Sequence, residues 1–180
     1  MLKWCKFGKV KSIFLAWVFL LAAFTVRSQP QLELKIFLAV DCPISQKYIA
    51  RLNELHARYP QVQMKGVISG KAESERAEGF SKEYNISFPL IKDIAYGAAR
   101  QYHAKITPEA VLLNENRLVY QGAIDNWFYA LGRYRKTTTE HYVVDAIESS
   151  LRGEEPKIKK TEAIGCFLQM PDSEKKKNHH

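Results

Sequence analysis

Two kinds of periodicity alternate along the chain, and this alternation limits the possible folds more than any other feature. A continuous apolar run predicts a buried strand over Leu34–Val40, and apolar residues spaced three and four apart predict a helix over Ser45–Tyr59, which Pro60 ends. A strand over Val62–Ser69 and a charged amphipathic helix over Glu73–Tyr84 follow. Successive strand–helix–strand units favour parallel strands joined by right-handed crossovers.

The second half of the chain predicts antiparallel strands. A short apolar segment at Phe88–Ile91 and a short helix at Tyr96–Tyr102 precede two strands, Glu109–Leu113 and Leu118–Ile124, that are joined by a hairpin turn. A last helix is predicted over Thr138–Leu151. The hairpin adds antiparallel strands to the sheet of parallel strands, so the predicted fold is α/β, with a central mixed β-sheet flanked by helices.

The first 28 residues have the pattern of a secretory signal. Four lysines precede an apolar core at residues 13–24, and the small residue Ser28 closes the segment. The prediction is a signal peptide at 1–28, or an uncleaved N-terminal anchor, followed by one domain at 29–168 and a polar tail at 169–180. The protein is therefore expected to be exported, to the periplasm or another extracytoplasmic space, and to meet the membrane only through this segment.

The basic charge belongs mainly to the two ends of the chain. Without the five basic residues of the first 28, the formal charge falls from +8 to +3, and part of that remainder lies in Lys175–Lys177. No nucleic-acid partner follows from such a distribution. The five histidines are scattered, so we expect no metal. Residues 125–136 are dense in aromatic and cationic side chains, which favours either a core-edge loop with stacked arginines or a partner-docking surface.

Cys42 is the strongest candidate for chemistry. It stands where the first strand pattern stops and the first helical pattern starts, and Pro43 suits a first helical turn. The positive end of a helix favours a thiolate over a thiol, so the pKa of Cys42 should lie below that of a free cysteine. The second position of a Cys-x-x-Cys pair is Ser45, which leaves Cys166 as the second sulfur, since Cys5 precedes the apolar core of the leader.

Four short motifs in this order resemble a known family. They are Asp41-Cys42-Pro43, Thr107-Pro108-Glu109, Gly122-Ala123-Ile124-Asp125 and Gly165-Cys166. Together they resemble the exported, redoxin-type (peroxiredoxin-related) bacterial proteins of thioredoxin-like fold, and the resemblance spans Leu34 to Phe167. It implies a cis bond at Thr107-Pro108, in a loop that faces Cys42 and keeps a backbone edge open for a partner.

The resemblance also implies the reaction. Cys42 would be the nucleophile and Cys166 the resolving cysteine of a thiol–disulfide oxidoreductase, with protein disulfides or a thioredoxin-like reductant as partners and with no cofactor. Ser45 is either a plain first-turn residue or a hydrogen-bond donor to the Cys42 thiolate. Peroxiredoxins carry threonine three residues before their reactive cysteine, and the residue here is Ala39.

Two other functions remain open at this point. One is a thiol peroxidase that acts on small peroxides, and the other is a non-catalytic docking module in which a Cys42–Cys166 disulfide is structural. Residues 154–160 lack a core-forming pattern and are expected to be mobile. Ile164 and residues 166–168 then form a short apolar patch that could dock beside the first helix.

Overall fold

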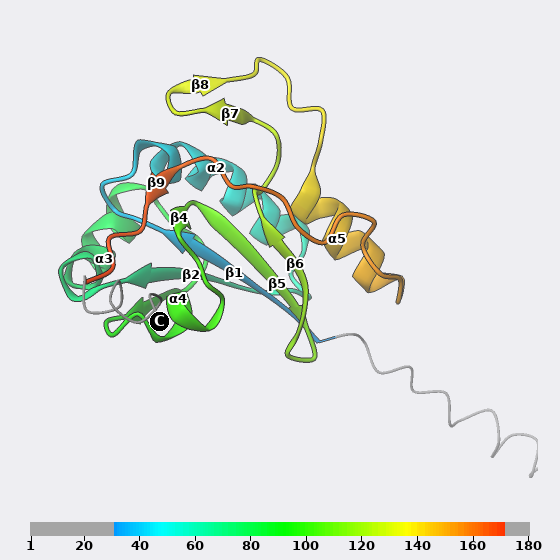
Figure 1. The fold of residues 1–180 in the computed structure, drawn as a ribbon, viewed down its shortest axis with the longest axis horizontal. Helices are drawn as coiled ribbons and strands as arrows, with labels where there is room; N and C mark the ends of the chain where they lie inside the picture. Colours follow the sequence, from blue (N-terminus) through cyan, green and yellow to red (C-terminus); the bar gives the residue numbers. More distant parts are fainter. Residues whose placement is uncertain (1–30, 172–180) are drawn as a thin grey trace, which may run out of the picture.

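A five-stranded mixed sheet forms the centre of the protein, which we describe from a computed structural model over residues 31–171. The predicted leader and most of the polar tail lie outside these residues. Figure 1 shows the arrangement. The elements are β1 (Leu32–Leu38), α2 (Pro43–Arg58), β2 (Gln63–Ser69), α3 (Lys71–Glu83), β3 (Leu90–Asp93), α4 (Gly97–Gln101), β4 (Ile106–Thr107), β5 (Glu109–Asn114), β6 (Arg117–Gly122), β7 (Phe128–Ala130), β8 (Arg133–Tyr134), α5 (Tyr142–Leu151) and β9 (Cys166–Phe167).

The strand order in the sheet is β3-β2-β1-β5-β6. β1 and β3 both lie parallel to β2, whereas β5 runs antiparallel to β1 and β6 antiparallel to β5. The parallel pairs follow from the strand–helix–strand alternation, and the antiparallel pairs follow from the hairpin turn at Glu115 and Asn116, both of which have positive φ. The predicted mixed sheet flanked by helices is therefore confirmed.

Each face of the sheet has its own apolar layer. The larger layer joins α2, α3 and α5 to the alternate β1 residues Leu34, Ile36 and Leu38. The other layer includes Phe37 and Ala99 and lies beneath α4. Alternate residues of a strand point to opposite faces, so β1 contributes to both layers and is fixed in register. This places the carboxyl end of β1, and the start of α2, at a well-determined position.

The last predicted helix begins later than expected. The sequence predicts a start at Thr138, but α5 begins at Tyr142. Residues 138–141 instead form a loop, in which the backbone N–H groups of Thr139 and Glu140 donate to Oδ1 of Asn126. The bonds to Asn126 hold this backbone in a non-helical course, an alternative to helix formation that sequence periodicity does not reveal.

The segment after α5 was expected to be mobile on its own, and in the structure part of it is held against the sheet. Residues 159–161 lie along the free edge of β6, where Gln121 N donates to Lys159 O at 3.0 Å and Thr161 N donates to Gln121 O at 3.1 Å. Gly122 has a φ of +143°, and a Cβ there would lie 2.3 Å from the Thr161 carbonyl oxygen, so the close approach needs glycine. After residue 161 this segment continues across the molecule to β9 (Figure 1).

Candidate functional site

Cys42 caps the N-terminus of α2. Its sulfur accepts a hydrogen bond from the backbone N–H of Ser45 at 3.4 Å, and Pro43 follows as the first residue of the helix. The side chain is 1% exposed. The sulfur thus lies at the positive end of a 16-residue helix, a setting that stabilises negative charge.

The loop before β5 faces this sulfur. The Thr107–Pro108 peptide bond is cis, as the resemblance implied. The thiol of Cys42 donates to the carbonyl oxygen of Thr107 at 3.2 Å, and Thr107 itself is fully buried. Residues 65 positions apart in the sequence are therefore in direct contact at the helix start.

A short strand pairing brings Cys166 to the same place. β4 pairs antiparallel with β9, and Thr107 lies opposite Cys166. The Thr107 hydroxyl donates to Cys166 O at 3.4 Å, and Leu168 N donates to Lys105 O at 2.8 Å. A Cβ on Gly165 would lie 2.0 Å from the Thr107 carbonyl oxygen. Only glycine allows this close approach. Because β9 pairs with β4, it occupies the backbone edge that the sequence analysis expected to stay open.

Both cysteines are free thiols, and both lie at Thr107: the Cys42 thiol donates to its carbonyl oxygen, and Cys166 lies opposite it and packs against the buried cluster that contains Cys42. Burial raises the pKa of Cys42, but hydrogen bonds from the Cys166 thiol and from Ser45 outweigh burial, so the pKa of Cys42 is lowered. Burial and the hydrogen bond to Cys42 raise the pKa of Cys166 to about 12. The hydrogen bond from the protonated Cys42 thiol to Thr107 O raises the pKa of Cys42. This single bond is outweighed by the donors to the sulfur and by the helix N-terminus, which lower the pKa. When the pair has lost one proton, the negative charge is therefore on Cys42, and Cys166 stays protonated.

Ser45 acts on the thiolate through two groups. Its backbone N–H and its hydroxyl both lower the pKa of Cys42. The hydroxyl oxygen accepts from Ala39 N–H at 3.4 Å, which leaves its proton free to point to the sulfur. Of the two roles left open by the sequence, the structure favours the hydrogen-bond donor over the plain first-turn residue.

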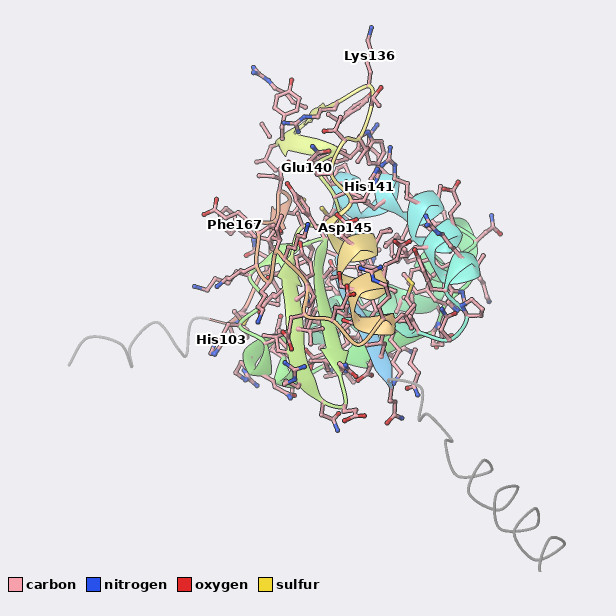
Figure 2. All side chains as sticks on the ribbon, turned by 90° about the vertical axis from the view of Figure 1, so that its right-hand side faces the viewer. His103, Lys136, Glu140, His141, Asp145 and Phe167 are labelled. Atoms are coloured by element: carbon pink, nitrogen blue, oxygen red, sulfur yellow. The ribbon has the colours of Figure 1, made fainter. Side chains whose placement is uncertain are left out.

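A second hairpin, which the sequence analysis did not predict, lies next to the thiols. β7 and β8 pair antiparallel and rise above the N-terminal part of α2 (Figure 1). Lys136, just after β8, points away from the body of the protein (Figure 2). At the base of the hairpin, Trp127 packs edge-on against Tyr48 with ring centroids 5.2 Å apart, and the guanidinium of Arg51 lies 4.0 Å from the Trp127 ring centroid. Within the segment itself the Arg135 guanidinium lies 5.1 Å from the Tyr129 ring centroid, so the stacked arginine of one alternative is present, beside a hairpin rather than in a plain loop.

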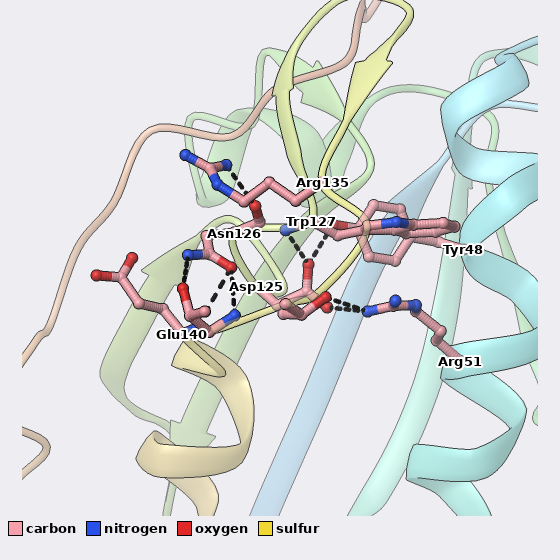
Figure 3. Close-up of polar contacts among 9 residues, drawn as sticks. Tyr48, Arg51, Asp125, Asn126, Trp127, Arg135 and Glu140 are labelled. Carbon is pink, nitrogen blue, oxygen red and sulfur yellow. Dashed lines mark hydrogen bonds and ion pairs between the residues drawn. The ribbon is translucent and has the colours of Figure 1, made fainter.

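Asp125 fixes this hairpin to α2 (Figure 3). The carboxylate is 7% exposed and accepts from the Tyr48 hydroxyl at 2.5 Å, from Arg51 Nη1 at 2.9 Å and from Trp127 N at 2.8 Å. Its two oxygens are thereby satisfied by two α2 side chains and by the backbone of Trp127, the residue just before the hairpin. A buried carboxylate with this many donors holds the residues around it in one arrangement, because moving any donor away would leave a buried negative charge without its partner. The dense composition of 125–136 was the only signal for this cluster.

An apolar groove separates the hairpin from the cysteines. It has a volume of about 230 Å³ and is lined by Pro43, Ile44, Lys47, Phe128, Leu131, Gly132, Tyr134 and Cys166. Two hollows of about 420 and 450 Å³ border α5, and neither is lined by a cysteine. In the described range 31–171, no helix is long and apolar enough to cross a membrane, and no group of three or more His, Cys, Asp or Glu side chains could hold a metal ion.

Comparison with known proteins reveals similarity at the level of structure. No family model matches the sequence, and no curated protein matches it. A hypothetical protein from Sinorhizobium meliloti is 24% identical, with a TM-score of 0.67 over 78% of this chain and 80% of that one. An uncharacterized conserved protein from Geobacillus kaustophilus is 21% identical, with a TM-score of 0.68 over 81% of this chain and 80% of that one.

A thiol-disulfide oxidoreductase from Bacteroides fragilis is 21% identical, with a TM-score of 0.45 over 51% of this chain and 71% of that one. The likeness to the Sinorhizobium meliloti and Geobacillus kaustophilus proteins bears on fold and not on activity. The mixed sheet, the cysteine at the junction of β1 and α2, and the cis-proline that faces it together make the fold thioredoxin-like. What the site does has to be argued from its own geometry.

Proposed function

We propose that this protein is an exported thiol–disulfide oxidoreductase in which Cys42 is the nucleophile and Cys166 the resolving cysteine. The observation that carries the proposal is that Thr107 brings two free thiols to one place: the Cys42 thiol donates to its carbonyl oxygen at 3.2 Å, and Cys166 lies opposite it in the β4–β9 pair. The pKa values of the two thiols are shifted in opposite directions. A low-pKa thiolate attacks disulfides at neutral pH, and a second thiol within reach releases the product. The leader pattern supports export.

The first half-reaction forms a mixed disulfide. The Cys42 thiolate attacks one sulfur of a partner's disulfide, a new sulfur–sulfur bond forms, and the partner's other sulfur leaves as a thiolate. Because Cys42 is 1% exposed beneath β9, this step requires β9 to move away from β4. The helix start and Ser45, which stabilise the thiolate, stay in place because they belong to the core of the fold.

The second half-reaction releases the partner. The Cys166 thiol attacks the Cys42 sulfur and passes its proton to the second partner sulfur, which leaves as a thiol, so that a Cys42–Cys166 disulfide remains. Two electrons pass from the protein's dithiol to the partner's disulfide. A further dithiol protein, of the thioredoxin-like class, then reduces the Cys42–Cys166 bond and completes the cycle. No cofactor takes part, because sulfur carries the electrons throughout.

Trapping of the mixed disulfide tests the assignment. Reduced protein is mixed with a disulfide-bonded protein such as insulin, and adducts are mapped by mass spectrometry without reductant. Cys166→Ser should accumulate an adduct on Cys42, whereas Cys42→Ser should form at most a trace and should lose reductase activity. An adduct that forms equally well on Cys166 in the Cys42→Ser variant would contradict the assignment of roles.

Two further measurements distinguish the alternatives. Hydrogen peroxide should react with the protein no faster than with an ordinary thiolate, because Ala39 stands where peroxiredoxins have threonine; fast, Cys42-dependent peroxide consumption would instead support a peroxidase. Equilibration in glutathione buffers should give a potential above about −300 mV. A lower potential, with a large loss of thermal stability on reduction, would make the disulfide structural and the module non-catalytic.

A further inference from the structure

The groove beside Cys166 has the features of a docking site that is continuous with the thiol pair. Its floor is formed by Pro43 and Ile44 of the helix start, and its far wall by Phe128, Leu131 and Tyr134 of the hairpin. Cys166 belongs both to this lining and to the redox pair. A side chain seated in the groove would therefore lie beside Cys166 and at the start of the helix that Cys42 caps.

The size of the groove indicates what kind of group it accepts. Sites for whole small molecules measure ~300–1,000 Å³, and this groove measures about 230 Å³. Its lining is apolar except for Lys47 and the cysteine. Leu131 is 65% exposed and Tyr134 51% exposed, so apolar surface faces water here until something covers it. A single large apolar side chain of a polypeptide matches this volume and this lining.

The charge around the groove indicates what flanks that side chain. The hairpin segment 128–137 contains Arg133, Arg135 and Lys136 and no acidic residue. Lys47 lies over the Tyr134 ring at 4.9 Å from its centroid. The carboxylate of Asp125, at the base of the hairpin, already accepts hydrogen bonds from Arg51 and Tyr48 and does not neutralise these cations. Lys47 is the cation of the lining, and the segment that forms the far wall is basic as a whole, so the electrostatic potential at the groove is positive and acidic residues of a partner complement it.

The hairpin is held in place before any partner arrives. Asp125 ties its base to α2, and the Tyr48, Trp127, Phe128 and Tyr134 rings form one cluster with neighbouring centroids 4.9 to 5.7 Å apart. A wall fixed in this way loses little conformational entropy on binding, so its apolar surface contributes more fully to affinity.

We infer that the groove selects the substrate of the proposed reaction: a polypeptide segment in which the exchanging cysteine is next to a large apolar residue and is flanked by acidic residues. This inference rests on the proposed function and adds a substrate class to it. The apolar residue enters the groove between α2 and the hairpin, the acidic residues lie in the positive potential of Lys47 and the basic hairpin, and the neighbouring cysteine is thereby brought to the Cys42–Cys166 pair. The exchange itself proceeds as described above.

Four synthetic peptide disulfides test the inference. Each is a symmetric disulfide of one five-residue peptide with a central cysteine, with leucine or serine on both sides of the cysteine and aspartate or lysine at both ends. The rate constant for reduction of each by the reduced protein is compared with that for hydroxyethyl disulfide, which is too small to use the groove. The leucine–aspartate peptide should react about tenfold faster than the serine–lysine peptide, equivalent to about 1.4 kcal/mol, and the mixed peptides should fall between them.

Two variants that carry the same substitution locate the effect. Leu131→Asp places a negative charge in the groove and should remove most of the ratio between the leucine–aspartate and serine–lysine peptides. Leu118→Asp is the matched control, because Leu118 is an exposed leucine at the start of β6, near the opposite end of the sheet (Figure 1), and this variant should keep the ratio.

The outcomes separate the two proposals. Equal rate constants for all four peptides, or a ratio that Leu131→Asp leaves unchanged, would overturn the groove inference while normal reduction of hydroxyethyl disulfide leaves the proposed function standing. Failure of the protein to reduce either the peptides or hydroxyethyl disulfide would overturn the proposed function, and the groove inference with it.

Discussion

The two cysteines meet at one site but are held by very different parts of the molecule. Cys42 lies between β1, whose neighbours on both sides are paired over six residues each, and α2, whose buried face spans Ile44 to Leu55. Cys166 lies in a strand of two residues that pairs only with β4, and its neighbour Phe167 is 74% exposed and points outward (Figure 2). One sulfur is fixed by the core, and the other is held by a short surface pairing.

This difference suits a dithiol that must open. Local opening costs least where few backbone bonds and little apolar burial must be given up. β9 is held by pairing with Ile106 and Thr107, and the residues after it by Lys105, by the Tyr96 hydroxyl and by apolar packing of Leu168 and Met170. Displacing Cys42 would instead require the end of β1 or the start of α2 to unfold. The nucleophile stays in its electrostatic setting, and the resolving cysteine moves away and returns.

The largest effect is expected from Gly165→Ala. The new Cβ would lie 2.0 Å from the Thr107 carbonyl oxygen, so β9 has to shift away from β4. Overpacking of this kind costs ~1–3 kcal/mol, which corresponds to a ~5- to 150-fold rise in the open population. Iodoacetamide labelling of Cys42 in the reduced protein, quantified at the peptide level, should accelerate by such a factor.

Gly79→Ala is the control for that variant, since a Cβ at Gly79 meets nothing within 4 Å. It should leave the labelling rate of Cys42 unchanged. If Gly165→Ala labels Cys42 no faster than wild type, then β9 does not limit access to the nucleophile, and the contrast between a fixed and a movable thiol fails.

The sequence predicted the fixed half of this contrast better than the movable half. The apolar runs and helical spacing around Cys42 predict β1 and α2 to within two residues, because both elements are stabilised by side chains that repeat with the period of the element. The cis bond at Pro108 followed from the family resemblance. No comparable repeat marks residues 154–168.

The missed parts are held by other means. Residues 159–161 are joined to β6 through backbone atoms of Gln121, and β9 is joined to β4 in the same way, so that neither contact imposes a side-chain pattern. The β7–β8 hairpin depends on Asp125, whose partners Tyr48 and Arg51 lie more than seventy residues earlier in the chain. Contacts between distant residues of this kind cannot be read from local periodicity.

A smaller effect, on stability rather than access, is expected from Thr161→Val. The Thr161 hydroxyl accepts from Ala123 N at 2.9 Å and lies 2.6 Å from the Tyr120 hydroxyl, so it anchors the segment that leads to Cys166. Valine keeps the shape and leaves the Ala123 N–H without its partner, at a cost of ~1–3 kcal/mol. Urea unfolding should show this loss.

The same variant sharpens the comparison of the two cysteines. If the moving part is β9 alone, Thr161→Val should change Cys42 labelling much less than Gly165→Ala does. Thr137→Val, at an exposed position, controls for the general effect of the substitution and should leave stability unchanged. An equal rise in labelling from Thr161→Val and Gly165→Ala would instead mean that the whole segment from Thr161 to Cys166 opens as one unit.

The smallest effect expected is in the pH dependence of the dithiol pair. In the native protein the first proton should leave with an apparent pKa below the ~8.5 of a free thiol, because Cys42 is stabilised as the thiolate, and the second should leave near a pKa of about 12. Thiolate absorbance near 240 nm, corrected with the Cys42→Ser/Cys166→Ser double variant for tyrosine ionisation, should show two separated steps. Unfolded protein should show both together near ~8.5.

The two shifts act on stability with opposite signs. The lowered pKa of Cys42 contributes stability that is fully present above ~8.5 and is lost as pH falls through the native value, whereas the raised pKa of Cys166 contributes stability that is present below ~8.5 and is lost as pH rises toward 12. The difference in unfolding free energy between the reduced protein and the double variant should therefore pass through a maximum near ~8.5. A flat difference, or a single unresolved step in the native titration, would mean that the two thiols ionise independently and that their contact does not create the nucleophile.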